Sequence, residues 1–217
     1  MRSSPASIAG VSPRFVELLE AEGLPGKRVL DVACGSGRLA LGLAPFAGHV
    51  VGLEREPTLV AEARERAAAA GLANAEFHEA DVEREEYAAH RPELVTAHLF
   101  ASDAMIERAG RALPPGGGLG VVCFHTDQWK ETGRPSRFAY SEARMAEVLG
   151  SHGFAPEVIE VEREERHFAS LEEALAGAVA LEERWRADGR WFRYIAYLEG
   201  GGRTLTRSHL VVKARRR

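Results

Sequence analysis

The chain has 217 residues, 45% of them hydrophobic, and its 28 basic and 32 acidic side chains give a net charge of −4. This length suits one domain with a full core, and the charge provides no broad positive surface for nucleic acid. Two cysteines are too few for a disulfide framework, and the first residues lack the apolar core of a signal peptide. We therefore expect a single domain over residues 1–217, located in the cytoplasm, with neither a membrane nor a nucleic acid as partner.

The predicted elements alternate between helix and strand. A serine–proline pair at residues 12–13 starts a helix that ends before Gly23, within a helical extension over residues 1–26. An apolar strand over residues 28–32 and a helix over residues 36–44 follow. This alternation indicates an α/β fold with a mostly parallel sheet covered on both faces. Later strands are predicted over residues 49–54, 75–79, 93–99 and 119–124, and later helices over residues 57–70, 103–113 and 141–150.

A glycine-rich turn between the first strand and the next helix is the most informative feature. Residues 31–37 read DVACGSG, in which Gly35 and Gly37 let a ligand lie against bare backbone at a helix N-terminus. The third glycine of a dinucleotide fingerprint is replaced by Ala40, and no Gly-Lys-Ser/Thr follows, which excludes the phosphate loop of NTPases. Glu54 ends the second strand, where a carboxylate can accept hydrogen bonds from both hydroxyls of a ribose. The pattern predicts a nucleotide-like cofactor.

Two further landmarks follow in order. Asp81 comes after the third strand, and a Leu-Pro-Pro-Gly-Gly turn at residues 113–117 precedes the fifth. Together with DVACGSG and Glu54, they resemble the four motifs of the class I S-adenosylmethionine-dependent methyltransferases, over about residues 12–165. The resemblance implies a doubly wound, Rossmann-like α/β sheet of seven mostly parallel strands with an antiparallel last strand. It also implies an enzyme that uses S-adenosyl-L-methionine, with Glu54 as the ribose acid and Asp81 as the adenine contact.

The resemblance assigns a set of cofactor-binding positions. One of them departs from the family, because Ala33 stands where many members carry the first glycine of the motif; alanine still permits close backbone approach. The expected cofactor-binding residues are Asp31, Ala33, Gly35, Gly37, Glu54, Asp81, Val82 and His98.

Three residues near the ends of strands four and five are candidates for catalysis. Methyl transfer from a sulfonium needs an aligned nucleophile and excluded water, with a general base only where the nucleophile is protonated. His98, His125 and Tyr140 are the candidates for contacting the acceptor or holding its proton. The alternative for each is a structural role, as a polar filler or loop residue. The eight histidines show no metal-ligand spacing, so we expect no metal site.

A long insertion precedes the last strand. In the resembled family this strand usually returns quickly as a hairpin, whereas here about forty residues separate a strand over residues 157–163 from one over residues 205–213. A capping box at Ser170 opens an amphipathic helix expected to carry Leu171 and Trp185 on one face. The aromatic insertion over residues 168–203 is interpreted either as a lid over the active site or as the surface of a homodimer.

We expect transfer of a methyl group to an O, N or C nucleophile of a small molecule. The alternatives are a macromolecule as acceptor, RNA or protein, and a module that binds the cofactor without catalysis. The sequence Thr96-Ala97-His98-Leu99 lacks the prolines typical of adenine- and amide-directed enzymes, and no Pro-Cys pair supports attack on cytosine C5. These absences favour the small-molecule acceptor.

Overall fold

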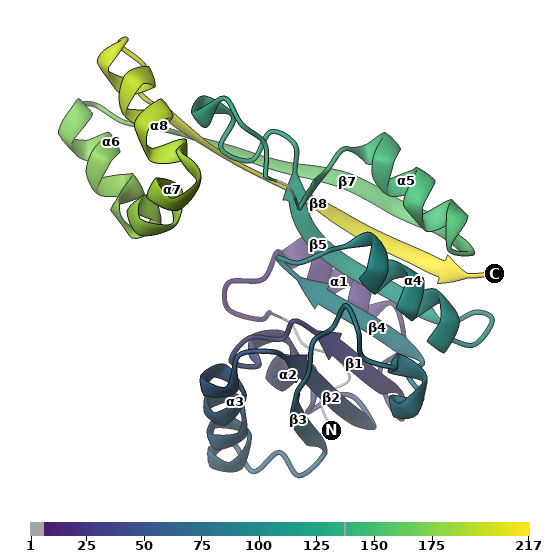
Figure 1. The fold of residues 1–217 in the computed structure, drawn as a ribbon. Helices are drawn as coiled ribbons and strands as arrows, with labels where there is room; N and C mark the ends of the chain where they lie inside the picture. Colours follow the sequence, from purple (N-terminus) through teal and green to yellow (C-terminus); the bar gives the residue numbers. More distant parts are fainter. Residues whose placement is uncertain (1–6, 137) are drawn as a thin grey trace.

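Alternating strands and helices form a three-layer α/β sandwich in the computed structural model, which describes residues 7–136 and 138–217 (Figure 1). Five parallel strands make up the main part of the sheet. They are β1 (Arg28–Val32), β2 (His49–Glu54), β3 (Ala75–Glu79), β4 (Leu94–His98) and β5 (Gly118–His125). Because helices cover both faces, β1, β2, β4 and β5 are buried along nearly their whole length.

The strand order places the end of β1 at a switch point. The order is β3-β2-β1-β4-β5-β8-β7, so the chain runs outward to one side of β1 and then returns to its other side. Val32, at the end of β1, pairs with Ala97 near the end of β4. In open α/β sheets, ligands bind outside the carboxyl ends of the strands at such a point.

The last strand is antiparallel to its two neighbours, as expected. β8 (Thr204–Arg216) lies between β5 and β7 (Phe154–His167) and runs opposite to both. The expected Rossmann-like fold class is therefore confirmed. A two-residue strand that we did not expect, β6 (Ala139–Tyr140), pairs with the end of β5 and brings the described sheet to eight strands.

Helices cover the two faces through separate apolar cores. α1 (Pro13–Glu20), α2 (Arg38–Leu43) and α3 (Pro57–Ala69) cover one face, and α4 (Asp103–Ala112) and α5 (Glu142–Ser151) cover the other. The N-terminal caps explain where several helices begin. Ser12, Ser102 and Ser141 each accept a hydrogen bond from the backbone N–H three residues further on. Of the helical extension expected over residues 1–26, residues 1–6 lie outside the described residues.

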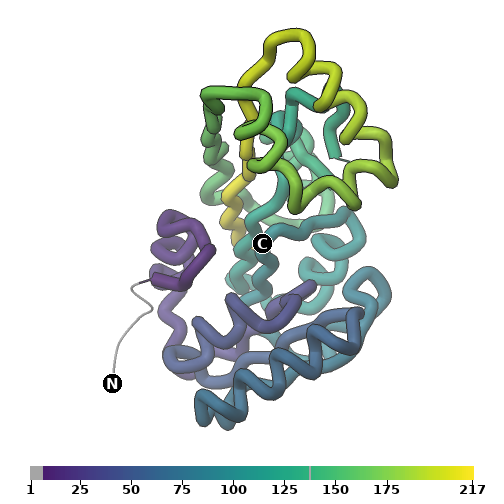
Figure 2. The backbone as a smooth tube through the Cα atoms, turned by 90° about the vertical axis from the view of Figure 1, so that its left-hand side faces the viewer, coloured from purple at the N-terminus to yellow at the C-terminus, as the bar shows by residue number. Residues whose placement is uncertain are grey.

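Residues 168–203 form a separate helical lobe at the end of a long hairpin (Figures 1 and 2). β5 pairs with β8 only as far as His209, while β7 and β8 remain paired to Thr204 and carry the lobe beyond the sheet. The lobe contains α6 (Leu171–Ala178), α7 (Glu182–Asp188) and α8 (Arg190–Glu199). Short 3-10 turns complete the structure: η1 (Tyr87–His90), η2 (Lys130–Thr132) and η3 (Val179–Leu181).

The expectation of one helix carrying both Leu171 and Trp185 was wrong. The capping box at Ser170 is present, but α6 ends at Ala178 and η3 separates it from α7. Gly177 weakens the helix at this point, and Phe168 packs so closely on it that a Cβ would lie 2.7 Å from the ring. Within the described residues, no helix is long and apolar enough to cross a membrane.

Candidate functional site

The glycine-rich turn after β1 leaves open space above its backbone. Ala33, Gly35 and Gly37 all have positive φ, of 54°, 54° and 80°. A Cβ built on Gly35 meets nothing within 4 Å, whereas one built on Gly37 lies 2.9 Å from the ring of Phe77. Gly35 therefore borders the space in which a ligand can lie, while Gly37 allows the turn to pack against β3.

The Glu54 carboxylate at the end of β2 is fixed by the backbone. One of its oxygens accepts hydrogen bonds from the N–H groups of Arg55, at 2.8 Å, and Glu56, at 3.1 Å. The other accepts from the N–H of Gly35 at 3.0 Å. A carboxylate anchored in this way keeps further lone pairs for donors from a ligand, in a defined direction.

Asp31 supports the turn from below. This carboxylate is 1% exposed, accepts from Thr96 Oγ1 at 2.9 Å and from the N–H of Ala40 at 3.1 Å, and so ties the start of α2 to β4. Burial raises its pKa to about 7, although the two hydrogen bonds oppose this shift. Asp31 also lines a small cavity over the glycine-rich turn.

Two adjoining cavities lie at the carboxyl ends of the strands. The larger has a volume of about 550 Å³ and the smaller, over the glycine-rich turn, about 180 Å³. Ala33, His98 and Leu99 line both cavities. The larger is lined by Ala33, Glu54, Arg55, Ala80, Asp81, Val82, Glu83, His98, Leu99, Phe100, Ala101, Phe124, Phe138 and Arg184. The expected positions Asp31, Ala33, Gly35, Glu54, Asp81, Val82 and His98 thus gather around these two adjoining cavities, whereas Gly37 lines neither of them.

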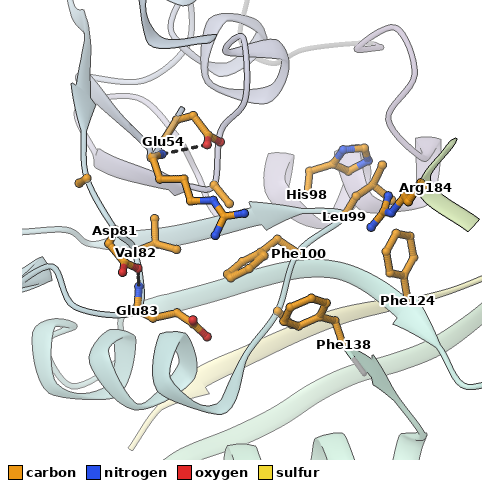
Figure 3. A pocket seen from close by; sticks show the side chains of 14 residues that line it. Glu54, Asp81, Val82, Glu83, His98, Leu99, Phe100, Phe124, Phe138 and Arg184 are labelled. Carbon is orange, nitrogen blue, oxygen red and sulfur yellow. Dashed lines mark hydrogen bonds between the residues drawn. The ribbon is translucent and has the colours of Figure 1, made fainter. Parts of the chain in front are cut away.

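The end of β3 provides a second acidic group. Asp81 Oδ1 accepts a hydrogen bond from the N–H of Glu83 at 3.0 Å, which closes a short turn, and the side chain remains half exposed. Val82 next to it is buried and presents an apolar surface to the cavity. Figure 3 shows Glu54, Asp81 and Glu83 together at one side of the larger cavity.

His98 stands where the two cavities meet. Its ring stacks on Phe15 of α1, with centroids 6.4 Å apart. Burial, together with the nearby positive charge of Arg38, lowers the pKa of His98 to about 4. The imidazole is therefore neutral at physiological pH, able to donate or accept one hydrogen bond but a poor acceptor of a proton.

Leu99 projects into both cavities from a strained backbone. Its φ is 64°, its N–H donates to the carbonyl of Val122 at 2.7 Å, and the residue is 40% exposed. A left-handed backbone conformation is rare for a bulky residue, because its Cβ is crowded there. Such outliers cluster at functional sites.

Several lining residues were not among our candidates. Phe100, Phe124 and Phe138 form an aromatic wall opposite the acidic side, and Arg184 of α7 completes it (Figure 3). The strand ends gave a signal for Phe100, because it follows β4 directly. No sequence signal pointed to Arg184, because only the docking of the helical lobe brings it to the sheet.

The two remaining catalytic candidates lie elsewhere. His125 is buried on the other face, where Nδ1 is 2.9 Å from Ser208 Oγ and Nε2 is 3.2 Å from Glu142 Oε2. This serine–histidine–carboxylate arrangement has no access to substrate, because Ser208 is 0% exposed. Tyr140 donates to Asp103 Oδ1 at 2.7 Å and lines a different, shallow depression. Neither residue lines the two cavities at the strand ends.

The described residues add neither a metal site nor an activated thiol, although Cys34 lines the smaller cavity. Among the described residues, no three histidine, cysteine, aspartate or glutamate side chains gather where they could hold a metal ion. Burial raises the thiol pKa of Cys34, beside the glycine-rich turn, and that of Cys123 in the core. Both thiols stay protonated near neutral pH, and neither is an activated nucleophile.

Comparisons with known proteins agree with this geometry. A methyltransferase-domain family model matches residues 24–176. The 23S rRNA (uracil(1939)-C(5))-methyltransferase RlmD of Shewanella sp. ANA-3 is 36% identical over 85 residues, which are 36% of this chain and 19% of that protein. The chain thus matches about a fifth of the length of that relative.

Solved structures share the fold over most of the chain. The YcgJ protein of Bacillus subtilis has a TM-score of 0.70 and 14% identity, covering 95% of this chain and 99% of its own. Magnesium protoporphyrin IX methyltransferase of Synechocystis PCC 6803, solved with bound S-adenosylmethionine, has a TM-score of 0.60 and 18% identity, covering 94% of this chain and 76% of its own.

Proposed function

The chain belongs to the class I S-adenosylmethionine-dependent methyltransferases, and we propose that it transfers the methyl group to an O, N or C nucleophile of a small molecule. The observation that supports this acceptor class is the larger cavity, which is continuous from Glu54 and Asp81 to an aromatic wall. Its volume of about 550 Å³ lies in the range of small-molecule sites, and its lining combines a charged end with an aromatic end.

The residues at one end of this cavity fit the cofactor. Glu54 is oriented by three backbone N–H groups to accept hydrogen bonds from ribose hydroxyls. Asp81 and Val82 offer a polar and an apolar surface to the adenine, and the space above Gly35 admits a ligand that no Cβ obstructs. S-adenosylmethionine, when bound, supplies a methyl group that is already electrophilic.

The chain itself then has to align the acceptor and exclude water. Leu99, Phe100 and Phe138 provide an apolar surface near His98, which holds the acceptor and removes water from around it. Neutral His98 accepts a hydrogen bond from the acceptor O–H or N–H and so directs its lone pair. Because the pKa of His98 is about 4, we assign it an orienting role rather than that of a strong base.

A second candidate acceptor is RNA, because RlmD is named as an rRNA methyltransferase. Carbon 5 of a pyrimidine is a weak nucleophile, and its methylation is helped by an attacking thiolate. Cys34 and Cys123 do not fit that role, because burial keeps both thiols protonated.

Radiolabel transfer distinguishes these acceptors. The protein is incubated with methyl-tritiated S-adenosylmethionine and, in separate reactions, with the fraction of a bacterial extract below 1 kDa, with total RNA and with total protein. We expect label in the small-molecule fraction with wild-type protein and its loss with Glu54→Ala. Label confined to RNA or to protein would contradict the proposed acceptor class.

A further inference from the structure

The aromatic end of the larger cavity carries a positive charge, that of Arg184, which indicates the chemical class of the acceptor. We propose that the acceptor is a flat, apolar molecule carrying an anionic group, and that Arg184 of the helical lobe binds that group. This inference rests on the proposed small-molecule methyltransferase, because it concerns the acceptor end of the same cavity.

The apolar part of the acceptor would lie against aromatic rings from separate segments. Phe100 follows β4, Phe124 lies near the end of β5, and Phe138 precedes β6. The rings of Phe100 and Phe138 have centroids 6.5 Å apart and are tilted by 44°. Figure 3 shows these two rings in the middle of the cavity, with Phe124 and Arg184 beyond them. Aromatic walls of this kind favour a flat ligand.

Arg184 is an exposed residue of α7 that lies over an aromatic ring. Its guanidinium carbon lies 6.0 Å from the centroid of the Trp129 ring, and Trp129 packs edge-on against Trp185, the next residue in α7. Among the described residues, no carboxylate lies within ion-pairing distance of Arg184. Its N–H donors, whose planar fork matches a carboxylate or phosphate, are therefore available to a ligand.

The surroundings of Arg184 carry an excess of positive charge. Arg190 also lies over Trp129, at 5.9 Å, and Arg134 donates to a backbone carbonyl of the same lobe. Burial, and after it the charges of Arg134 and Arg184, lower the pKa of Arg190, while Asp188 opposes this shift. Among the described residues, Arg190 is paired with Asp188, whereas Arg134 and Arg184 form no ion pair.

The opposite side of the cavity has the opposite sign. Glu54, Asp81 and Glu83 line it, and Arg55 next to Glu54 is the other arginine of the lining. An acceptor with a carboxylate or phosphate is therefore repelled from the cofactor end and attracted to the lobe. This polarity would place the anionic group at Arg184 and leave the rest of the molecule against the aromatic wall, facing His98.

A pair of matched probes tests the proposal. We would measure the dissociation constants of 1-naphthoate and of neutral 1-naphthylmethanol by NMR titration, with the protein saturated with S-adenosylhomocysteine. We expect naphthoate to bind about tenfold more tightly, which corresponds to about 1.4 kcal/mol. Arg184→Ala should reduce the ratio of the two dissociation constants to about one. Arg184→Lys should retain part of the preference for naphthoate, because lysine keeps the positive charge but lacks the planar guanidinium.

Arg193→Ala is the control variant. Arg193 is exposed on α8 of the same lobe and does not line the cavity, so its replacement removes equal charge and should leave the preference unchanged. Equal binding of the two probes to the wild type, no binding of either probe, or a preference that survives in Arg184→Ala would overturn the proposal.

Calorimetry with S-adenosylhomocysteine on the same samples separates the acceptor inference from the proposed function. If that ligand binds and the preference is absent, only the acceptor inference fails; if it does not bind, the proposed function fails as well.

Discussion

At the scale of single residues, two glycines of the same turn are expected to have different roles. Gly35→Ala places a methyl group in the open space above the turn, so it should weaken S-adenosylhomocysteine binding about tenfold or more and destabilise the fold by about 1 kcal/mol, through its positive φ. Gly37→Ala adds contact with Phe77 to the same strain and should destabilise the fold by about 2–3 kcal/mol. Calorimetry and urea unfolding of both variants measure these effects. Intact binding in a folded Gly35→Ala protein would contradict the cavity that we assign to the cofactor.

His98 predicts a pH dependence of stability. Burial lowers its pKa in the folded state from 6.5 to about 4, so between these values the unfolded chain binds more protons than the folded one. The stability of the wild type should therefore fall as the pH decreases from 6.5 towards 4, and His98→Gln should remove about 2 kcal/mol of that fall by pH 5. Urea unfolding of both proteins at pH 7.5 and pH 5 gives the comparison. An equal decrease of the free energy of unfolding in the two proteins would contradict the lowered pKa of His98.

At the scale of elements, the helical lobe packs through a buried aromatic residue on Trp129, in the loop after β5. Trp185 is fully buried between Trp129 and Tyr194, with ring centroids 5.2 and 5.5 Å away. Trp185→Ala should destabilise the lobe by about 3–5 kcal/mol. Hydrogen exchange should then increase over residues 168–203, while α3 and β2, which do not contact the lobe core, keep their protection.

Trp185→Phe provides the matched control for that variant. The indole Nε1 is buried, and no hydrogen-bond partner for it lies among the described residues, so a phenyl ring loses contact area but no hydrogen bond. We expect Trp185→Phe to destabilise the lobe by less than half as much as Trp185→Ala does. Exchange that increases equally in the lobe and in the sheet after Trp185→Ala would show that the lobe does not open separately.

At the scale of the whole molecule, a buried ionic network joins the first helix region to the last strand. The Glu22 side chain is 1% exposed and pairs with Arg215 at 2.6 Å and Lys213 at 2.9 Å, both on β8. Burial opposes its charge, but hydrogen bonds from these two cations outweigh burial and lower its pKa to about 2. The carboxylate therefore stabilises the fold fully above pH 4.5, and this stabilisation is lost as the pH falls towards 2.

Glu22→Gln should destabilise the protein at pH 7 by about 2–3 kcal/mol, because Lys27, Lys213 and Arg215 lose their buried partner and only the last two keep a second one, Glu157. The difference from the wild type should stay constant down to about pH 5 and shrink by pH 3, as measured by urea unfolding. Glu17→Gln makes the same chemical change at an exposed position of α1 and should have little effect. A difference for Glu22→Gln that grows on acidification would contradict the charged network.

The parts of the molecule that the sequence could predict are those with a local signal. Strand and helix periods, serine caps and the turn at Gly35 depend on neighbouring residues, and they located the sheet, most helices and the space beside Glu54. The burial of His125 between Ser208 and Glu142, and the arrival of Arg184 at the aromatic wall, depend on contacts between distant segments. The length of β7 and β8, which carries the lobe to the strand ends, likewise follows from pairing across the whole hairpin.

The most direct test of this account is a calorimetric titration of S-adenosylhomocysteine into wild-type, Glu54→Ala and Glu65→Ala protein. Glu65 is exposed on α3 and lines neither cavity, so its variant controls for the loss of one negative charge. We predict that the wild type and Glu65→Ala bind alike, and that Glu54→Ala loses about 1.5–3 kcal/mol, the value of a hydrogen bond to a charged group. Unchanged affinity in Glu54→Ala, or tighter binding of NAD than of S-adenosylhomocysteine to the wild type, would contradict the cofactor site described above.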